Sequence, residues 1–195
     1  MTQPVPDPSS APSFDSSVPP PHVPQSGDGW VQCACGNRHW GLFGAAGLFL
    51  VRRDGDGRWA EVVMQHRALW SHQGGMWGIP GGALNAHESA REGAVREAVE
   101  EAGVLPDAVR VLGSHALTHA DWSYVTVVAE CTDPLAAVSA TDAESLEVRW
   151  LPLDLLRMAV EQASASVSWG GVQVELLAPF FGALPALLRI LDDSL

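Results

Sequence analysis

Three glutamates, Glu97, Glu100 and Glu101, lie within five residues of one another in the segment 82–104. On a helix these positions span roughly 100° of the helical wheel, so their carboxylates share one surface. Like charges at this spacing repel by about 0.2–0.5 kcal/mol per pair, and the negative end of the helix dipole lies nearby. An all-oxygen anionic site of this kind suits a hard cation such as Mg²⁺. The alternative is a solvated acidic face, which is the usual fate of a glutamate-rich helix.

A single helix is predicted to position these carboxylates. Glu88 and Ser89 provide N-terminal charge and capping, and Gly103 followed by Pro106 indicates the end of the helix. The predicted buried face is a stripe of small and apolar residues at helical spacing, formed by Ala90, Ala94, Ala98, Ala102, Val95 and Val99. Because alanine side chains are short, the helix axis can lie close to a sheet.

The same segment carries a spaced set of fixed residue types. These are Gly82, Glu88, the pair Arg96-Glu97, the pair Glu100-Glu101 and Gly103. The spacing resembles the Nudix box, and the preceding Trp77-Gly78-Ile79-Pro80-Gly81-Gly82 resembles the usual lead-in of that family. The resemblance to the Nudix hydrolase family (MutT-like) implies an α/β fold in which a mixed β-sheet is sandwiched between helices.

The resemblance also implies roles for the residues of the box. Glu97, Glu100 and Glu101 would be the ligands of Mg²⁺, with Mn²⁺ as the alternative ion, and the backbone around Gly81 and Gly82 would close the site. Arg96 would orient the carboxylates, because its fork can bridge them. Glu88 would hold the loop to the helix, and His87 stands where a glycine is frequent in the family.

Further candidates lie outside the box. A carboxylate after residue 138 is expected to reach the metal or act as the base, with Glu144 as the first choice, Glu147 in reserve and a solvated loop acid as the alternative. Arg67 either contacts phosphate or ends a strand. Trp77 either stacks on a base or packs in the core. His119 and Asp121 share a loop from which they could touch substrate, although such loop residues are more often solvated.

A zinc site is considered at Cys33, Cys35 and His39. A structural zinc ion normally takes four ligands in pairs two to four residues apart, and Cys131 is nearly a hundred residues away. The spacing therefore favours a turn before the first strand and leaves zinc as the alternative. Three cysteines also fit reduced thiols better than a disulfide framework.

The remaining chain is predicted as one domain, residues 30–195, after a disordered tail rich in proline and serine, residues 1–29. Strands are expected at 43–51, 59–66, 108–117, 123–131, 148–153 and 172–177, helices at 152–163 and 180–191, and a loop at 164–171. The sequence shows neither a secretory signal nor eighteen consecutive apolar residues, so we expect a cytoplasmic protein without a membrane span. The apolar C-terminal stretch could serve contacts in a homodimer.

Charge restricts the class of partner. The 195-residue chain has a formal net charge of −12, and its eleven basic residues are all arginine. Such a chain lacks the basic surface that nucleic-acid polymers require, whereas a small nucleotide or nucleotide sugar arriving with Mg²⁺ remains compatible. The resemblance then implies hydrolysis of a phosphoanhydride bond in a nucleoside diphosphate derivative, of the NTP or 8-oxo-dGTP class or of the ADP-ribose class. The alternatives are a non-catalytic nucleotide sensor and an isoprenoid diphosphate isomerase, for which Cys131 is weak support.

Overall fold

The structure is a computed structural model that describes residues 26–71 and 73–194. Its centre is a mixed sheet of seven strands, in which β3 and β8 are parallel and the other pairs are antiparallel. The strands run in the order β5-β4-β3-β8-β7, with β6 paired to β3 and β9 to β4. Their bounds are β3 Ala45–Arg53, β4 Trp59–Arg67, β5 Trp77–Gly78, β6 Gly81–Ala83, β7 Val109–Thr118, β8 Ser123–Cys131 and β9 Ser145–Pro152.

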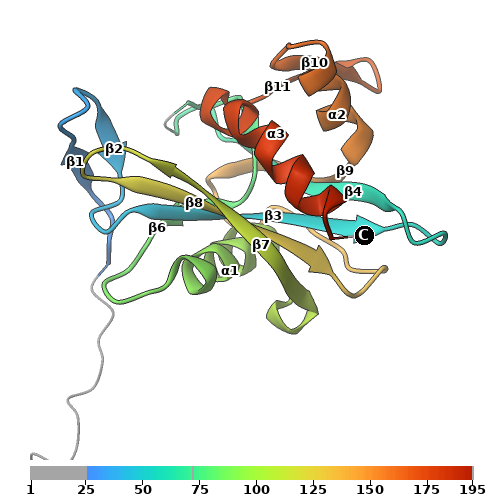
Figure 1. The fold of residues 1–195 in the computed structure, drawn as a ribbon, viewed down its shortest axis with the longest axis horizontal. Helices are drawn as coiled ribbons and strands as arrows, with labels where there is room; N and C mark the ends of the chain where they lie inside the picture. Colours follow the sequence, from blue (N-terminus) through green and yellow to red (C-terminus); the bar gives the residue numbers. More distant parts are fainter. Residues whose placement is uncertain (1–25, 72, 195) are drawn as a thin grey trace, which may run out of the picture.

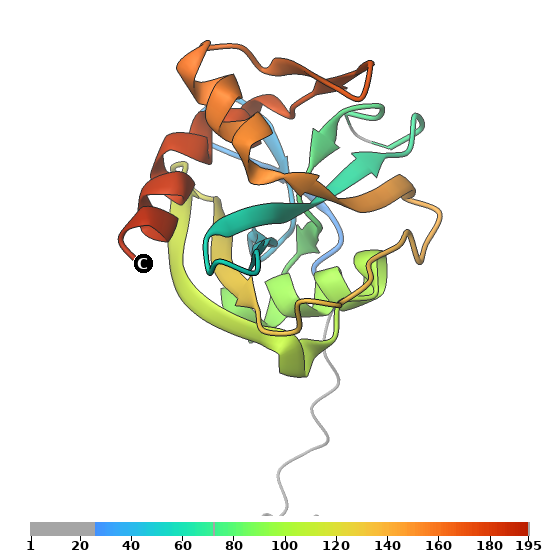
Figure 2. The same cartoon turned by 90° about the vertical axis from the view of Figure 1, so that its right-hand side faces the viewer.

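Helices cover both faces of this sheet. α1 (Ala90–Ala102) lies on one face, while α2 (Leu153–Glu161) and α3 (Ala178–Asp192) lie on the other (Figure 1, Figure 2). Alternation along β3 serves both layers, because Leu48 and Leu50 belong to the core under α1 and Phe49 belongs to the core under α2 and α3. The predicted sheet between helix layers is confirmed.

The sheet splits between β3 and β4, and the split positions the site. β3 pairs with β4 through residues 51–53, but pairs with β6 through residues 45–47 at its other end. The small residues Ala45, Ala46 and Gly47 of β3 allow the close approach, because a Cβ atom at Gly47 would lie 2.1 Å from the Tyr124 hydroxyl. The backbone of residues 81 and 82 is thereby brought beneath α1.

Two hairpins depart from the predicted elements. β1 (Trp30–Gln32) and β2 (Arg38–Trp40) form a two-stranded sheet where only a turn was expected. The loop predicted at 164–171 is wrong, since β10 (Ser166–Trp169) pairs there with β11 (Val172–Glu175). Gly170 and Gly171 join β10 to β11 with φ values of 58° and 82°, and a Gly-Gly pair is a recognised hairpin signal.

The buried face of α1 also differs from its prediction. The alanines of the stripe pack on the sheet as expected, except that Ala90 is only partly buried. Val99, however, is 38% exposed, and the buried surface extends instead through Gly93 and Glu101. The split sheet places the backbone N–H of Gly81 on that side, where it donates a hydrogen bond to the buried Glu101 carboxylate.

The tail predicted for residues 1–29 lies outside the described residues apart from 26–29, so it stays a prediction. There, the carbonyl groups of Gly27 and Gly29 accept hydrogen bonds from the backbone of Leu42 and Gly41. Within residues 26–71 and 73–194, no helix combines the length and apolar character needed to cross a membrane.

Candidate active site

A cavity of ≈ 570 Å³ opens beside α1, and its volume lies in the usual range for small-molecule sites. Three kinds of side chain line it. The carboxylates are Asp28, Glu97, Glu100, Glu101, Asp142 and Glu144; the cations are Arg67 and Arg96; the aromatic rings are Trp30, Trp40 and Trp70. Gly81 and Gly82 contribute backbone to the same wall. The cavity therefore brings together eight residues proposed from the sequence: Arg67, Gly81, Gly82, Arg96, Glu97, Glu100, Glu101 and Glu144.

Glu101 is the most deeply placed of the carboxylates. It is 3% exposed, and its Oε2 accepts a hydrogen bond of 2.8 Å from the backbone N–H of Gly81. Burial raises the pKa of Glu101 to about 7; the hydrogen bonds from Gly81 and Gln65 oppose this shift, and the charges of Glu97 and Asp142 add to it. A buried carboxylate among other carboxylates is electrostatically suited to a nearby cation.

Glu97 lies against the loop before the helix. A Cβ atom at Gly82 would lie 2.5 Å from Oε1 of Glu97, so glycine is the residue that allows this approach. Burial raises the pKa of the Glu97 carboxyl, while the guanidinium of Arg96, at 2.8 Å from Oε1, acts in the opposite direction. The predicted closing of the site by the backbone at Gly82 has this close contact as its structural basis.

Arg96 joins the loop, the helix and the carboxylates. Its Nε and one terminal nitrogen donate to the two oxygens of Glu88 at 2.8 and 2.9 Å, and the same terminal nitrogen donates to the carbonyl of Ala83 at 2.9 Å. Its other terminal nitrogen donates to Glu97 and, at 3.1 Å, to Glu100. Hydrogen bonds from Arg96 lower the pKa of Glu88, whose Oε2 also accepts from the backbone of Asn85. These contacts match the orienting role expected for Arg96 and the holding role expected for Glu88.

The residues suit a divalent cation by their chemistry. Glu97, Glu100 and Glu101 offer hard oxygen donors, which Mg²⁺ and Mn²⁺ prefer. A second observation comes from Gln65, which is fully buried and donates to Ser145, while its side-chain oxygen has no hydrogen-bond donor among the described residues. An orphaned acceptor next to Glu101 suits an ordered water, and Mg²⁺ usually retains several waters.

The loop from 139 to 145 faces the end of α1 and supplies two further acids. Glu144 lines the cavity as predicted. Asp142 also lines it, although the sequence suggested no role for this residue. The backbone N–H of Glu144 donates to Oδ1 of Asp142 at 3.1 Å. Glu147, the reserve candidate, lies in β9 opposite His66 and forms an ion pair with Arg149. The structure therefore favours Asp142 over Glu147 as the second candidate for the base.

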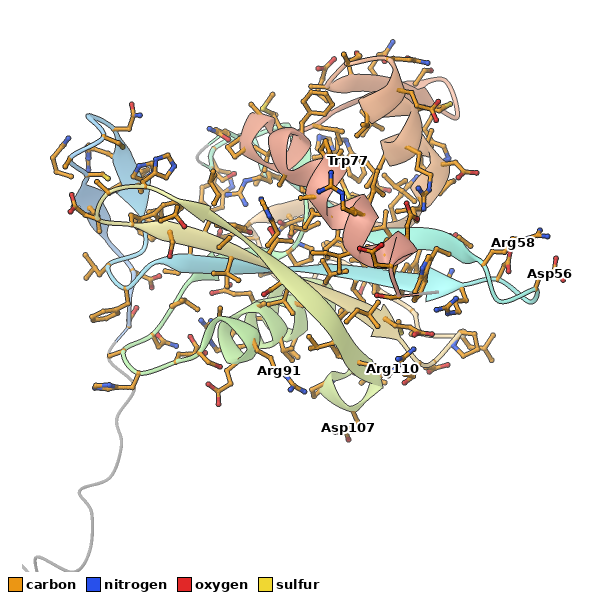
Figure 3. The ribbon with its side chains drawn as sticks, viewed as in Figure 1. Asp56, Arg58, Trp77, Arg91, Asp107 and Arg110 are labelled. Carbon is orange, nitrogen blue, oxygen red and sulfur yellow. The ribbon has the colours of Figure 1, made fainter. Side chains whose placement is uncertain are left out.

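Trp77, which the sequence offered as a residue that could stack on a base, does not line the cavity. It is 4% exposed, stacks on His66 at 4.7 Å and belongs to the core that packs against α3 (Figure 3). Its packing role, which the sequence left open, is the one the structure shows. Position decides this, because β5 directs the indole to the face of the sheet opposite α1.

The aromatic wall of the cavity was missed by sequence reasoning for two of its three tryptophans. Trp30 and Trp40 pair across the β1–β2 hairpin, with ring centroids 5.4 Å apart, and each is about two-fifths exposed. Trp70, whose place in the loop before Trp77 allowed it either to stack on a base or to pack, is 70% exposed. The available signal was the Gly36-Asn37 turn between two short runs that carry tryptophan, which indicates a hairpin.

Three other residues of interest lie away from the cavity lining. Cys131 ends β8 in the core under α1, which removes the support it lent to the isomerase alternative. His119 and Asp121 contact the β1–β2 hairpin: the His119 ring lies 4.3 Å from that of His39, and Asp121 accepts from the N–H of Ala34. Neither residue lines the cavity, so their substrate contact, which the sequence offered only as a possibility, has no support there.

His87 adopts a φ of 66°, in the left-handed region that glycine adopts most easily. This backbone conformation is the physical reason why a glycine is frequent at the corresponding position of the Nudix box.

Comparison with known proteins gives matches that agree with the Nudix resemblance of the sequence. The NUDIX domain family model matches residues 42–169. The chain is 51% identical over 135 residues to a nucleoside triphosphate pyrophosphatase/Nudix hydrolase fusion protein of Bifidobacterium longum, which covers 68% of this chain and 28% of that protein. It is 44% identical over 146 residues to putative 8-oxo-dGTP diphosphatase 3 of Mycobacterium tuberculosis, covering 69% of this chain and 65% of that protein. The chain thus spans less than two thirds of the length of either curated relative.

A solved structure extends the similarity to the fold. The crystal structure of a Nudix hydrolase from M. smegmatis, RenU, has a TM-score of 0.66 to this chain at 33% identity. The match covers 85% of this chain and 96% of that one.

Proposed function

The chain belongs to the NUDIX domain family, and on that premise we propose that it is a metal-dependent pyrophosphohydrolase. Its substrate would be a nucleoside diphosphate derivative, and the bond cleaved would be a phosphoanhydride. The observation that carries this proposal is the composition of the cavity, in which hard carboxylate donors, two arginines and three tryptophans meet. Each group matches one part of a nucleotide bound with its metal ion.

The metal would be Mg²⁺ or Mn²⁺, held by Glu97, Glu100 and Glu101. When bound, such an ion neutralises diphosphate oxygens and lowers the pKa of a coordinated water. The chain's own residues supply the rest. Arg96 orients two of the three glutamates, Gly81 fixes the third through its N–H, and Glu144 or Asp142 takes the proton from the attacking water.

The nucleotide would lie with its phosphates toward the carboxylates and its base toward the tryptophans. Arg67 lines the cavity and would contact phosphate oxygens together with the metal, since the planar fork of arginine suits phosphate. Trp30, Trp40 and Trp70 offer exposed rings on which a base can stack. The names of the curated relatives support the nucleoside triphosphate and 8-oxo-dGTP class, with ADP-ribose as the alternative. A cytoplasmic location and a homodimer stay predictions.

The test is product release from a panel comprising dGTP, 8-oxo-dGTP, the other nucleoside triphosphates, ADP-ribose and dinucleoside polyphosphates. Each substrate is assayed with Mg²⁺, with Mn²⁺ and with EDTA. Glu101→Gln removes the buried carboxylate with little change of shape, and Glu161→Gln, an exposed glutamate of α2 on the other face of the sheet, is the matched control. We expect turnover of one class that requires metal, falls by about 100-fold or more in Glu101→Gln and is unchanged in Glu161→Gln.

Other outcomes have definite meanings. Tight binding of one nucleotide without turnover of any would replace the hydrolase with the non-catalytic sensor. Turnover of similar size in Glu101→Gln and Glu161→Gln would contradict the assigned metal ligands, whatever the substrate.

A further inference from the structure

The turn of the β1–β2 hairpin gathers two thiols and an imidazole. The candidate ligand atoms of Cys33, Cys35 and His39 all lie within 4.8 Å of one another, and Cys35 Sγ lies 3.2 Å from His39 Nε2. Zinc bonds of about 2.3 Å to sulfur and about 2.0–2.1 Å to nitrogen place tetrahedral ligands about 3.5–3.8 Å apart. We propose that Cys33, Cys35 and His39 bind a zinc ion at the tip of this hairpin.

Backbone geometry explains how a spacing that argues against zinc can still form a cluster. Val31 pairs with His39 in the hairpin, which sets the imidazole beside the turn. The N–H of Cys33 donates to the carbonyl of Asn37, and the N–H of Gly36 donates back to the carbonyl of Cys33, each at 3.0 Å. Gly36 has a φ of 89°, so the chain reverses directly after Cys35, and the Cys35 thiol lies toward His39. Pairing of the two strands therefore brings His39 to the two cysteines. Zinc sites usually show a second closely spaced pair of ligands in the sequence instead.

The cluster is supported by the turn between β7 and β8, which lies beside the hairpin (Figure 1). Oδ2 of Asp121 accepts a hydrogen bond of 2.8 Å from the N–H of Ala34, the residue between the two cysteines. The His39 ring stacks on Trp122 at 4.5 Å and 10°, which fixes the plane of the imidazole. Three side chains leave one tetrahedral position for a water, and Asp121 supports the turn through its hydrogen bond to the N–H of Ala34.

A metal at this position would have a structural consequence. β1 and β2 have three residues each and form a separate two-stranded sheet, which is marginally stable by itself. A zinc ion would cross-link the turn and brace the hairpin that carries Trp30 and Trp40. Only this link to the aromatic wall rests on the proposed function; the metal site itself does not.

Reduced thiols are part of the proposal. All three cysteines of the chain are free, and Cys33 is buried while Cys35 is exposed. Zn²⁺ is redox-inactive and binds the thiolate form, so binding releases protons and requires no oxidant.

The experiment measures metal content and ligand type in the full chain. The protein is purified in reducing buffer without chelator, zinc is measured by mass spectrometry, and the metal is then replaced by Co²⁺. A thiolate-to-cobalt charge-transfer band separates binding at cysteine from binding at the glutamates of the cavity, which give no such band. We expect one zinc per chain and a charge-transfer band in the wild type.

Two variants make the assignment specific. Cys35→Ser changes an exposed side chain and should fold, and we expect it to lose the band and to bind zinc at least about 100-fold more weakly in a competition titration. Cys131→Ala removes the distant cysteine and should keep both.

The proposal is overturned if the reduced wild type holds no zinc and shows no charge-transfer band with Co²⁺. It is equally overturned if Cys35→Ser keeps the zinc content and the band of the wild type. Neither readout depends on hydrolysis, so a failure of the proposed function would leave this result unaffected.

Discussion

Replacement of Arg96 by alanine tests how the site is held together. All five guanidinium N–H groups of Arg96 donate, and three of the four acceptor groups are carboxylates, those of Glu88, Glu97 and Glu100. The side chains of Glu88 and Glu97 are only 13% and 15% exposed. Arg96→Ala would therefore leave two mostly buried carboxylates without their cation.

The magnitude follows from these exposures. Removing one partner of a buried ion pair costs about 3–5 kcal/mol, but the Arg96 side chain is 27% exposed, so we expect a value near the lower end, about 3 kcal/mol. The pair with Glu100 adds little, because the Glu100 side chain is 57% exposed and surface pairs contribute about 0–1 kcal/mol. For a domain of this size, about 3 kcal/mol lowers Tm by roughly 6–12 °C.

The assay is urea unfolding followed by tryptophan fluorescence, with a thermal scan as the second measurement. Arg91→Ala is the matched control, because Arg91 is an exposed arginine of the same helix with no ion pair among the described residues (Figure 3). Both variants introduce alanine into α1, so helix propensity cancels, and the control should change by less than about 0.5 kcal/mol. If Arg96→Ala and Arg91→Ala lost equal stability, the stabilising role assigned to the contacts of Arg96 with Glu88 and Glu97 would be refuted.

Three further perturbations test neighbouring parts of the site. Gly82→Ala should displace the Glu97 carboxylate, since the added Cβ would lie 2.5 Å from Oε1, and should weaken Mg²⁺ activation of hydrolysis in a metal titration; unchanged activation would contradict the close approach. Ser89→Ala removes the capping box of α1 and should cost about 1 kcal/mol in urea unfolding, and a loss below about 0.3 kcal/mol would show that the cap contributes little. Because the folded-state pKa of Glu88 is lowered, its contribution is present above the ordinary value of 4.5 and is lost as pH falls through the lower folded value. The Glu88 part of the stability difference between wild type and Arg96→Ala should therefore be full near neutral pH and shrink as acid protonates that carboxylate. A stability difference that does not change with pH would point to lost packing instead.

Local signals in the sequence were sufficient for the helix of the site. Ser89 caps α1 with its side chain and Gly103 ends the helix at a φ of 68°, both as the residue types predict. The order of strands and helices followed from alternation and turn residues in the same way. The exceptions were short: β1, β2, β6 and β10 have three or four residues each, too few for alternation to be read.

Contacts between distant segments could not be predicted in this way. Glu101 is buried because the split sheet brings Gly81 to it, and Trp77 leaves the site because β5 turns its indole to the opposite core. Asp142 reaches the cavity only because its loop packs against the end of α1. These outcomes depend on which strands pair, and a linear pattern does not record pairing.

The sequence by itself determined the family, the helix that carries Glu97, Glu100 and Glu101, and the hard-oxygen chemistry of their carboxylates, since each depends on residue type and short spacing. The tertiary structure alone decided how the carboxylates differ: one buried with a raised pKa, one held against a glycine and one mostly exposed. It also decided that the tryptophans of the hairpin face the same cavity and that Cys33, Cys35 and His39 meet at one point. The physical reason is that burial and charge environment arise from segments far apart in the chain, which only the folded sheet brings within contact distance.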